Sequence, residues 1–402
     1  MVANIVHQFV LVTTAIVAGY AAIVLFLSFP APQRWAVYLH WVNYPFFTDF
    51  ATPEYFGFGH NKVRNVQITA EDGASIGAWH FLPSHYFMGQ QLRYRSKENM
   101  QDAIYDLALG NPDYDTVIYF HGNAGNRAAP WRVDLYKKIG DKFPNVNVIA
   151  IDYRGFGDSK GTPSEEGLRM DARATWDWLR ERGVPNDRIS IIGHSLGELH
   201  FALYKGAIDV ILIMFFVGTG IATSLAYELS RDGNPPKALI LKAAYSSLPT
   251  LLFEYRALKY IPFFAPLKLF PPVQEWLKSR MVHQFDSLSR IQYVDCPILI
   301  IYGAVDFEIP GHNSQKLFHR AIYGLEAEVH YSDEWLASDP NVKNVTIPDE
   351  VSVYQHHRNP DVKLAVLTYA HHNNVGYFDY VFEAMGRTAK WVLPGEVQLV
   401  EV

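Results

Sequence analysis

Residues 191–197 read IIGHSLG and fit the pattern G-x-S-x-G, with Ser195 at its centre, directly after an apolar run. A serine on a tight turn between a strand and a helix is held in a strained conformation, and its hydroxyl is exposed above the edge of the sheet. Small residues two positions before and after the serine allow such a turn to close. We therefore predict Ser195 as a nucleophile, with the backbone N–H of Leu196 pointing at the oxyanion that forms in acyl transfer.

Short apolar runs rich in Ile and Val recur on both sides of this motif. Runs of this kind, bounded by turn residues, are typical of strands buried on both faces of a parallel sheet. Such strands are expected at 116–120, 147–151, 189–193, 238–242, 298–302 and 364–369, after two strands at 66–70 and 75–81. Helical segments lie between them, and one begins at the capping sequence TPSE, residues 162–165, with Pro163 at the first helical position. The alternation predicts an α/β fold, a mostly parallel sheet with helices on both faces.

A second turn with a chemical signature follows the strand at 116–120 and reads HGNAG, residues 121–125. A glycine-flanked turn at this place offers a second backbone N–H to the oxyanion, and Asn123 is the best-placed donor. Taken alone, the motif is also compatible with an ordinary turn at the end of a strand. The presence of Ser195 downstream favours the catalytic interpretation.

A nucleophilic serine needs a base, and the base needs an acid that orients it. In the α/β-hydrolase fold these residues follow in the order Ser, Asp or Glu, His. Asp306 comes shortly after the predicted strand at 298–302, and Glu308 is a nearby rival. His372 follows the last predicted strand, with His371 beside it as the alternative base.

Composition excludes several other classes of function. The 402 residues carry 35 Lys and Arg against 41 Asp and Glu, a net charge of −6, and no basic run occurs, so a nucleic-acid partner is not expected. The single cysteine, Cys296, rules out an internal disulfide framework and any Cys-rich zinc site. Neither a convincing metal-ligand spacing of histidines nor a Gly-rich phosphate loop is present, so we expect no metal and no cofactor.

The N-terminus contains a candidate membrane anchor. Residues 9–29 are uncharged over 21 positions, enough to span a bilayer as a helix. Pro30 ends the run, and the aromatic residues that follow resemble an interfacial belt. A cleaved signal peptide is the alternative, but no Lys or Arg precedes the run, and the run is longer than the apolar core of a typical signal peptide. The expected organisation is an anchor at 1–35, a linker at 36–65 and a hydrolase domain at 66–402.

Three segments of that domain stand apart. Residues 84–113 are polar and mixed, and we expect a surface arm there. Residues 246–294 are rich in Phe, Tyr, Leu and Pro, which fits either a helical lid over the site or a crossover that packs on the core. Residues 152–159, DYRGFGDS, are expected to form a scaffold near the site, with Arg154 paired to Asp158.

With these residues in hand, the chain resembles the membrane-anchored α/β-hydrolase-domain lipases. The similarity is greatest to the lysophosphatidylserine and monoacylglycerol lipase type, the twelfth abhydrolase-domain subgroup. It rests on HGNAGNR, IDYRGFGDSKGTPSEEG, GHSLG and the regions around Asp306 and His372, and runs from about residue 66 to about 389. The resemblance implies Ser195 as nucleophile, Asp306 as acid and His372 as base, because the H-x-x-x-G-Y pattern of the family starts at His372. It also implies an endoplasmic-reticulum membrane location with a lumenal catalytic domain, with which the sequon Asn344-Val345-Thr346 is compatible.

One segment departs from this family. The small-residue helix start TGIATS, expected straight after GHSLG, appears only after 21 extra residues, 198–218. An unspliced intron that preserved the frame is one explanation, and a lineage-specific insertion is the other. The insert puts Leu199, Phe201 and Tyr204 where small residues would pack against the sheet. We therefore expect either strain in the tight turn at Ser195, called the elbow below, or a displaced helix after it. Either change would make the chain a weak or inactive hydrolase.

The leading hypothesis is a membrane-bound serine hydrolase that cleaves acyl esters of lysophospholipids or monoacylglycerols through an acyl-enzyme. The same residues would serve a thioesterase that removes acyl groups from cysteines. A catalytically inactive membrane scaffold is the hypothesis from a different class, and the insert makes it plausible.

Overall fold

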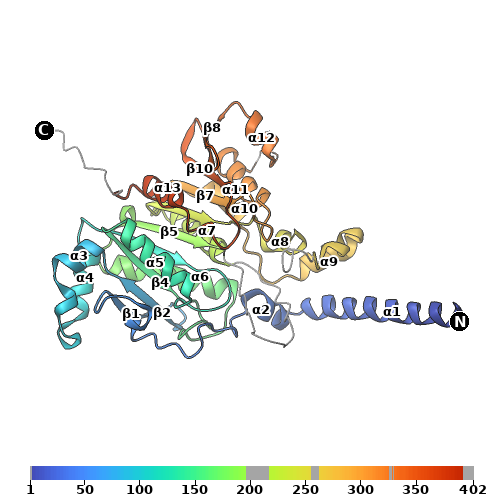
Figure 1. Ribbon diagram of the computed structural model, residues 1–402, viewed down its shortest axis with the longest axis horizontal. Helices are drawn as coiled ribbons and strands as arrows, with labels where there is room; N and C mark the ends of the chain where they lie inside the picture. The colour runs from blue at the N-terminus through green and yellow to red at the C-terminus, as the bar shows by residue number, and fades with distance from the viewer. Residues whose placement is uncertain (1, 196–216, 255–261, 326–327, 329, 393–402) are drawn as a thin grey trace.

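The computed structural model describes residues 2–195, 217–254, 262–325, 328 and 330–392, and it shows one ten-stranded sheet within them (Figure 1). The strands are β1 (Val63–Thr69), β2 (Ser75–Phe81), β3 (Asp115–Phe120), β4 (Val146–Ile151), β5 (Ile189–His194), β6 (Ala238–Lys242), β7 (Ile298–Gly303), β8 (Val342–Ile347), β9 (Val351–His356) and β10 (Asn359–Leu367). Their order across the sheet is β1-β2-β4-β3-β5-β6-β7-β10-β9-β8.

The six central strands, from β4 to β10, are parallel, whereas β1, β2, β8 and β9 pair antiparallel at the two edges. The predicted α/β sheet is therefore confirmed, and every central strand overlaps its apolar run. The last parallel strand was misplaced, because it starts at Asn359 and ends at Leu367 rather than spanning 364–369. Strands β8 and β9 were not predicted at all.

Helices cover both faces of the sheet. α6 (Glu165–Glu181), α7 (Gly218–Arg231) and α11 (His312–Tyr323) pack into the core on one face, whereas α5 (Pro130–Lys142) and α13 (Asp379–Ala389) pack into the core on the other. The capping prediction for α6 was two residues early. Ser164, not Thr162, is the N-cap, and its hydroxyl accepts a hydrogen bond of 3.0 Å from the Gly167 N–H.

The remaining helices are short apart from the first. They are α1 (Val2–Leu27), α2 (Pro30–Tyr38), α3 (Ser84–Gly89), α4 (Asp102–Gly110), α8 (Leu248–Glu254), α9 (Pro271–Arg280), α10 (Ser287–Arg290) and α12 (Asp333–Ser338), with 3₁₀ turns at Pro53–Phe56, Leu92–Tyr94, Lys97–Asn99, Asn186–Arg188, Ala265–Leu269 and Ile291–Tyr293. The predicted surface arm at 84–113 is thus a helical lobe, and it has a small core of its own made of Leu82, Phe87, Leu92, Tyr105 and Ala108.

α1 projects from the domain as a long exposed helix (Figure 1). It is the one helix among the described residues that is long and apolar enough to cross a membrane. Among the described residues, its last turns contact the domain through Tyr20, Val24 and Leu27, which lie on one helix face. The Tyr20 hydroxyl donates a hydrogen bond of 3.0 Å to the Phe263 carbonyl.

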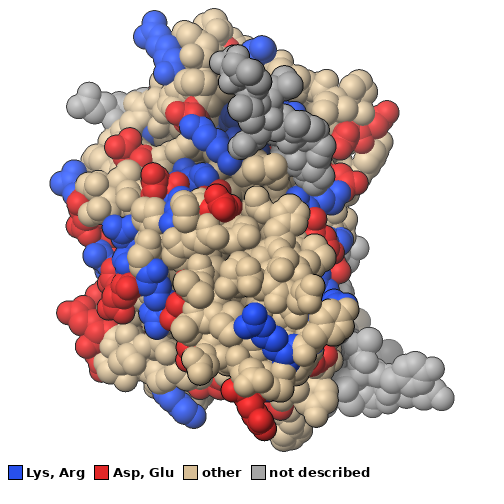
Figure 2. All heavy atoms as spheres, turned by 90° about the vertical axis from the view of Figure 1, so that its left-hand side faces the viewer, with Lys and Arg blue, Asp and Glu red and all other residues tan. Residues whose placement is uncertain are grey.

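Phe263 belongs to the segment between β6 and β7, which we call the cap segment (residues 246–294). The described part of the cap segment is helical, and Leu252, Phe264 and Leu277 join the main core. Phe270 and Trp276 remain exposed beside them. The face of the molecule turned away from α1 mixes acidic and basic side chains over its described surface (Figure 2).

Candidate active site

Ser195 lies at the carboxyl end of the central strand β5. The β5–β6 ladder pairs His194 with Lys242, and the Ser195 N–H donates a hydrogen bond of 3.1 Å to the Lys242 carbonyl, which extends the ladder by one residue. The Ser195 side chain is buried. Leu196, the predicted oxyanion donor, lies outside the described residues.

The next helix that the structure describes after Ser195 is α7, which begins at Gly218. A Cβ on Gly218 would lie 2.3 Å from the His194 carbonyl oxygen and 2.7 Å from those of Phe120 and His121, so only glycine fits there. On the strand side, a Cβ on Gly193 would meet Ala222 at 2.6 Å. α7 therefore packs as closely against the ends of β3 and β5 as is required of the helix that follows a nucleophilic serine.

This arrangement corrects one expectation about the insert. The first turn of the helix is made by Gly218, Thr219 and Gly220, not by bulky residues of residues 198–217. Leu199, Phe201 and Tyr204 lie outside the described residues. Because glycine stands at both 197 and 218, removal of 197–217 or of 198–218 yields the same chain, and the structure places Gly218 at the elbow.

The predicted acid and base lie together. β7 and β10 pair in parallel, with Leu367 opposite Gly303, so the turns that follow them start side by side. The hydrogen bond between His372 Nδ1 and Asp306 Oδ2 is 2.7 Å long, and both side chains are buried. The other oxygen, Asp306 Oδ1, accepts hydrogen bonds from the N–H groups of Glu308 (3.0 Å) and Ile309 (2.9 Å).

The neighbouring residues that the sequence offered as alternatives make different contacts. His371 is half-buried, and its N–H donates to the Asn374 side chain, so it shapes the loop while His372 faces the acid. Glu308 contributes its backbone N–H to Asp306. The imidazole of His372 is also close enough to His194, the neighbour of Ser195, to act on it electrostatically. Burial first, then Lys242 and His372, lower the pKa of His194 well below its usual value.

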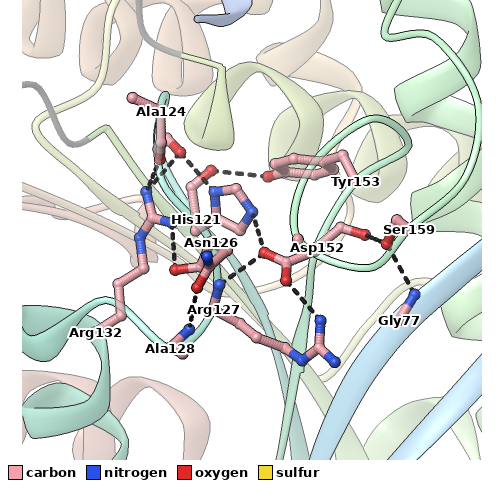
Figure 3. A network of polar contacts seen from close by, with 12 residues as sticks. Gly77, His121, Ala124, Asn126, Arg127, Ala128, Arg132, Asp152, Tyr153 and Ser159 are labelled. Atoms are coloured by element: carbon pink, nitrogen blue, oxygen red, sulfur yellow. Dashed lines mark hydrogen bonds and ion pairs between the residues drawn. The ribbon is translucent and has the colours of Figure 1, made fainter. Parts of the chain in front are cut away.

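The HGNAG turn after β3 is held by the buried guanidinium of Arg132 (Figure 3). Its two terminal nitrogens donate to four carbonyls, those of Gly122 (3.0 Å), Asn123 (3.2 Å), Ala124 (2.7 Å) and Asn126 (2.8 Å). The Asn123 N–H makes no hydrogen bond within the part of the chain that the structure describes, as an oxyanion donor should. Sequence reasoning missed Arg132, since its only signal is a position soon after the turn.

Asp152 ties this turn to the DYRGFGDS segment (Figure 3). Its carboxylate accepts hydrogen bonds from the Arg127 N–H (2.7 Å) and guanidinium (2.6 Å), and it lies 3.2 Å from His121 Nε2. Burial raises the pKa of Asp152, but Arg127 and His121 outweigh it and lower the pKa overall. The scaffold prediction for this segment fits these contacts.

The predicted partner of Arg154 was wrong. Arg154 pairs with Asp171 and Asp72, whereas Asp158 pairs with Arg127 at 2.7 Å. Two arginines thus share four carboxylates around the turn, a distribution that spacing along the chain does not reveal.

Lys242 was also missed, because it ends an apolar strand and carries no motif. Its side chain is fully buried, and Nζ has no hydrogen-bond partner among the described residues. It lies against Gly376 of the His372 loop, where a Cβ would be 2.6 Å from Nζ. Burial lowers the pKa of Lys242 to about 7. Elsewhere, the described residues contain no group of three or more His, Cys, Asp or Glu that could hold a metal ion.

Comparison with known proteins places these residues in context. The family model for the alpha/beta hydrolase fold matches residues 115–204. Lysophosphatidylserine lipase ABHD12 of Xenopus tropicalis is 31% identical over 295 residues, which cover 73% of this chain and 66% of that protein. The Gallus gallus protein of the same name is 31% identical and covered to 67%, and Protein ABHD12B of Homo sapiens is 30% identical and covered to 68%. The chain spans slightly under two thirds of the first of these relatives and of its rat and mouse counterparts.

Among solved structures, the Pyrococcus furiosus esterase Pf2001 superposes with a TM-score of 0.51 and 18% sequence identity, over 87% of this chain and 97% of that one. At this identity the likeness establishes the fold alone.

The buried Lys242 predicts a pH dependence of stability. Its pKa is about 7 in the folded chain and roughly 10.4 when unfolded, so the unfolded state binds more protons between these pH values. The free energy of unfolding should therefore rise with pH, by about 2 kcal/mol from this group between pH 7 and pH 9. Denaturant melts of the detergent-solubilised protein and of Lys242→Met at both pH values measure it. The variant should lose this rise, and equal pH slopes in the two proteins would contradict the prediction.

The insert predicts a loss of activity that deletion restores. Twenty-two residues separate Ser195 from Gly218 in the sequence, whereas in the family the helix start follows GHSLG at once, so we expect the oxyanion donor after the serine to be lost. Removing residues 198–218 should raise ester turnover by about 10²-fold, the effect of regaining one oxyanion donor. Steady-state hydrolysis by the two chains, each matched against its Ser195→Ala form, provides the comparison. Equal turnover would refute the idea that the insert impairs the site.

Proposed function

The chain belongs to the α/β-hydrolase family that includes ABHD12 and ABHD12B, and on this premise we propose that it is a membrane-bound serine hydrolase. Its substrates are acyl esters of lysophospholipids or monoacylglycerols, cleaved through an acyl-enzyme. The observation that carries the proposal is the buried 2.7 Å hydrogen bond between His372 and Asp306, on the same edge of the sheet as Ser195.

In this mechanism Ser195 attacks the ester carbonyl while His372 accepts its proton. Asp306 holds the imidazole in the orientation that leaves the other ring nitrogen for the serine, and it stabilises the imidazolium that forms. The N–H groups of Leu196 and Asn123 bind the oxyanion of the tetrahedral intermediate. His372 then protonates the leaving alcohol, and the acyl group stays on Ser195. In the second half of the reaction water attacks this ester while His372 accepts its proton, and His372 then protonates Ser195 as the fatty acid leaves.

Three features support a lipid as the substrate. The relatives that match are named lysophosphatidylserine lipases. The cap segment exposes Phe270 and Trp276, and it contacts the end of α1 through the hydrogen bond from the Tyr20 hydroxyl to the Phe263 carbonyl. If α1 is not cleaved and crosses the bilayer once, it would hold the catalytic domain next to the membrane lipids.

Substitution of the proposed triad should abolish hydrolysis without unfolding the chain. In the chain that lacks residues 198–218, Ser195→Ala should lower kcat by a factor on the order of 10⁶, to background, because the nucleophile is lost. Asp306→Asn keeps the shape but favours the wrong imidazole tautomer, which should cost about 10⁴ in kcat. Release of fatty acid from 1-acyl lysophosphatidylserine and from monoacylglycerol in mixed micelles measures both effects.

A fluorophosphonate probe gives an independent readout of the same site. It should label the full chain at Ser195 and leave Ser195→Ala unlabelled, with His371→Ala as a control that retains labelling. Full esterase activity in Ser195→Ala would remove this mechanism, and an unlabelled full chain would favour a scaffold.

The proposed location is the endoplasmic-reticulum membrane, with the catalytic domain in the lumen. Asn344 of the sequon lies exposed on β8, an edge strand, where a glycosyltransferase could reach it. Thr346 is also exposed, and its hydroxyl donates a hydrogen bond of 3.2 Å to the Asn344 side chain.

This orientation predicts glycosylation at one site. The chain expressed in mammalian cells should lose apparent mass on endoglycosidase H treatment, and Asn344→Gln should remove that shift. Gel mobility before and after treatment is the measurement, and Gln355→Asn, which creates no sequon, serves as a control on the neighbouring strand. An unglycosylated wild-type chain would contradict the lumenal orientation.

A further inference from the structure

The segment that leads from α2 into the domain lies directly on the HGNAG turn. We name residues 37–45 the strap and residues 122–126 the oxyanion loop. We propose that the strap positions the oxyanion loop, so that the region next to the anchor is a working part of the active site rather than the linker expected from the sequence. This inference rests on the proposed hydrolase function.

Three backbone hydrogen bonds join the two segments. The N–H groups of three successive loop residues donate to strap carbonyls: Ala124 to Tyr38 (3.4 Å), Gly125 to Val42 (2.7 Å) and Asn126 to Tyr44 (2.9 Å). The residues that these bonds join are 82 to 86 positions apart in the chain. These bonds tie three successive loop residues to the strap, although neither segment is part of the sheet.

Side chains at both ends of the loop strengthen the contact. The Asn126 amide donates to the Asn43 side-chain oxygen at 2.9 Å and to the Pro45 carbonyl at 3.1 Å. At the other end, the Asn123 side-chain amide donates to the Val37 carbonyl. Gly125 adopts a φ of +63°, and a Cβ there would lie 2.9 Å from the Tyr44 oxygen, so the strap approaches the loop as closely as glycine permits.

The loop is thus held from two sides by different atoms. Arg132 binds its carbonyls, and the strap binds its N–H groups from Ala124 to Asn126. The Asn123 N–H, the proposed oxyanion donor, remains for substrate. Because the loop has no regular secondary structure, its position depends on these two sets of bonds.

The strap itself is anchored firmly enough to serve as a template. Val37, Tyr38, Leu39 and Val42 are buried in the main core. The Tyr38 hydroxyl lies 3.2 Å from His283 Nδ1 in the cap segment. Just before the strap, the Gln33 side chain donates to the Arg280 carbonyl (2.8 Å) and accepts from the Val282 N–H (2.9 Å). Contacts with the cap segment therefore fix the start of the strap, on the N-terminal side of most of its bonds to the oxyanion loop.

Asn43 offers a clean test, because its side chain contacts the loop yet it lies outside the proposed triad and oxyanion donors. Asn43→Leu removes the acceptor for Asn126, and Asn43→Asp keeps one. Both variants are made in the full chain, with Tyr94→Leu as a control on the exposed surface of the helical lobe. The readouts are kcat and KM on a soluble short-chain ester, hydrogen exchange of the amides of residues 124–126, and the melting temperature.

Asn43→Leu should speed exchange at residues 124–126 and lower kcat by about 10- to 100-fold, with KM within two-fold, because an oxyanion donor acts on the transition state. Asn43→Asp should retain most of the activity. If Asn43→Leu does not fold, Asn43→Ala takes its place with the same expectations. Faster exchange with unchanged kcat, or a lower kcat with unchanged exchange, would overturn the proposal.

Failure of the proposed function gives a different result. In that case the full chain would show no hydrolysis above its Ser195→Ala form and no fluorophosphonate labelling. Exchange at residues 124–126 would still respond to Asn43→Leu, since the strap contacts do not depend on catalysis.

Discussion

Parallel pairing of β3, β5, β7 and β10 is the constraint on which the site depends. The ladders put Phe120 beside Gly193, His194 beside Lys242 and Leu367 beside Gly303, so the turns that follow these strands all start at one edge of the sheet. Three of those turns supply the nucleophile, the acid and the base of the proposed mechanism. A shift of one residue in any ladder would turn every side chain of that strand to the opposite face and separate the groups.

Close approach at glycine makes this edge compact. Gly303 and Gly218 leave no room for a Cβ, since it would lie 2.0 Å from the Ala370 oxygen and 2.3 Å from the His194 oxygen, respectively. Several polar groups at the edge are buried as well, and their cost is offset where they are paired: Arg132 with four carbonyls, Arg127 and His121 with Asp152. Ser195 Oγ and Lys242 Nζ have no hydrogen-bond partner among the described residues, and burial lowers the pKa of Lys242.

The central sheet could be predicted from the sequence because each buried strand is a short run of Ile and Val bounded by turn residues. The edge strands β8 and β9 could not, whereas β1 and β2 at the other edge overlap the strands expected at 66–70 and 75–81. β8 carries Lys343, Asn344 and Thr346 and is almost wholly exposed, so it shows no apolar run. The placement of Ser195, Asp306 and His372 after their strands followed from the same apolar runs.

What the sequence could not reveal were the contacts between distant segments. Nothing near Arg132 marks it as the residue that binds the oxyanion loop, and the strap residues read as an aromatic linker after the anchor. The start of the helix after Ser195 could not be assigned for another reason. Because glycine stands at both 197 and 218, the insert can be taken as 197–217 or as 198–218. The close packing of Gly218 on the end of β5 favours the first choice.

The contacts of Gln33 with the cap segment have a mechanical consequence. These bonds and the Tyr20–Phe263 hydrogen bond are made by residues that precede the strap in the chain, so they resist a pull or tilt of α1 before the strap is strained. In the proposed membrane-bound form, a load on α1 is therefore shared with the body of the domain. In that form the tilt of this single helix would also set the angle between the proposed catalytic edge of the sheet and the bilayer.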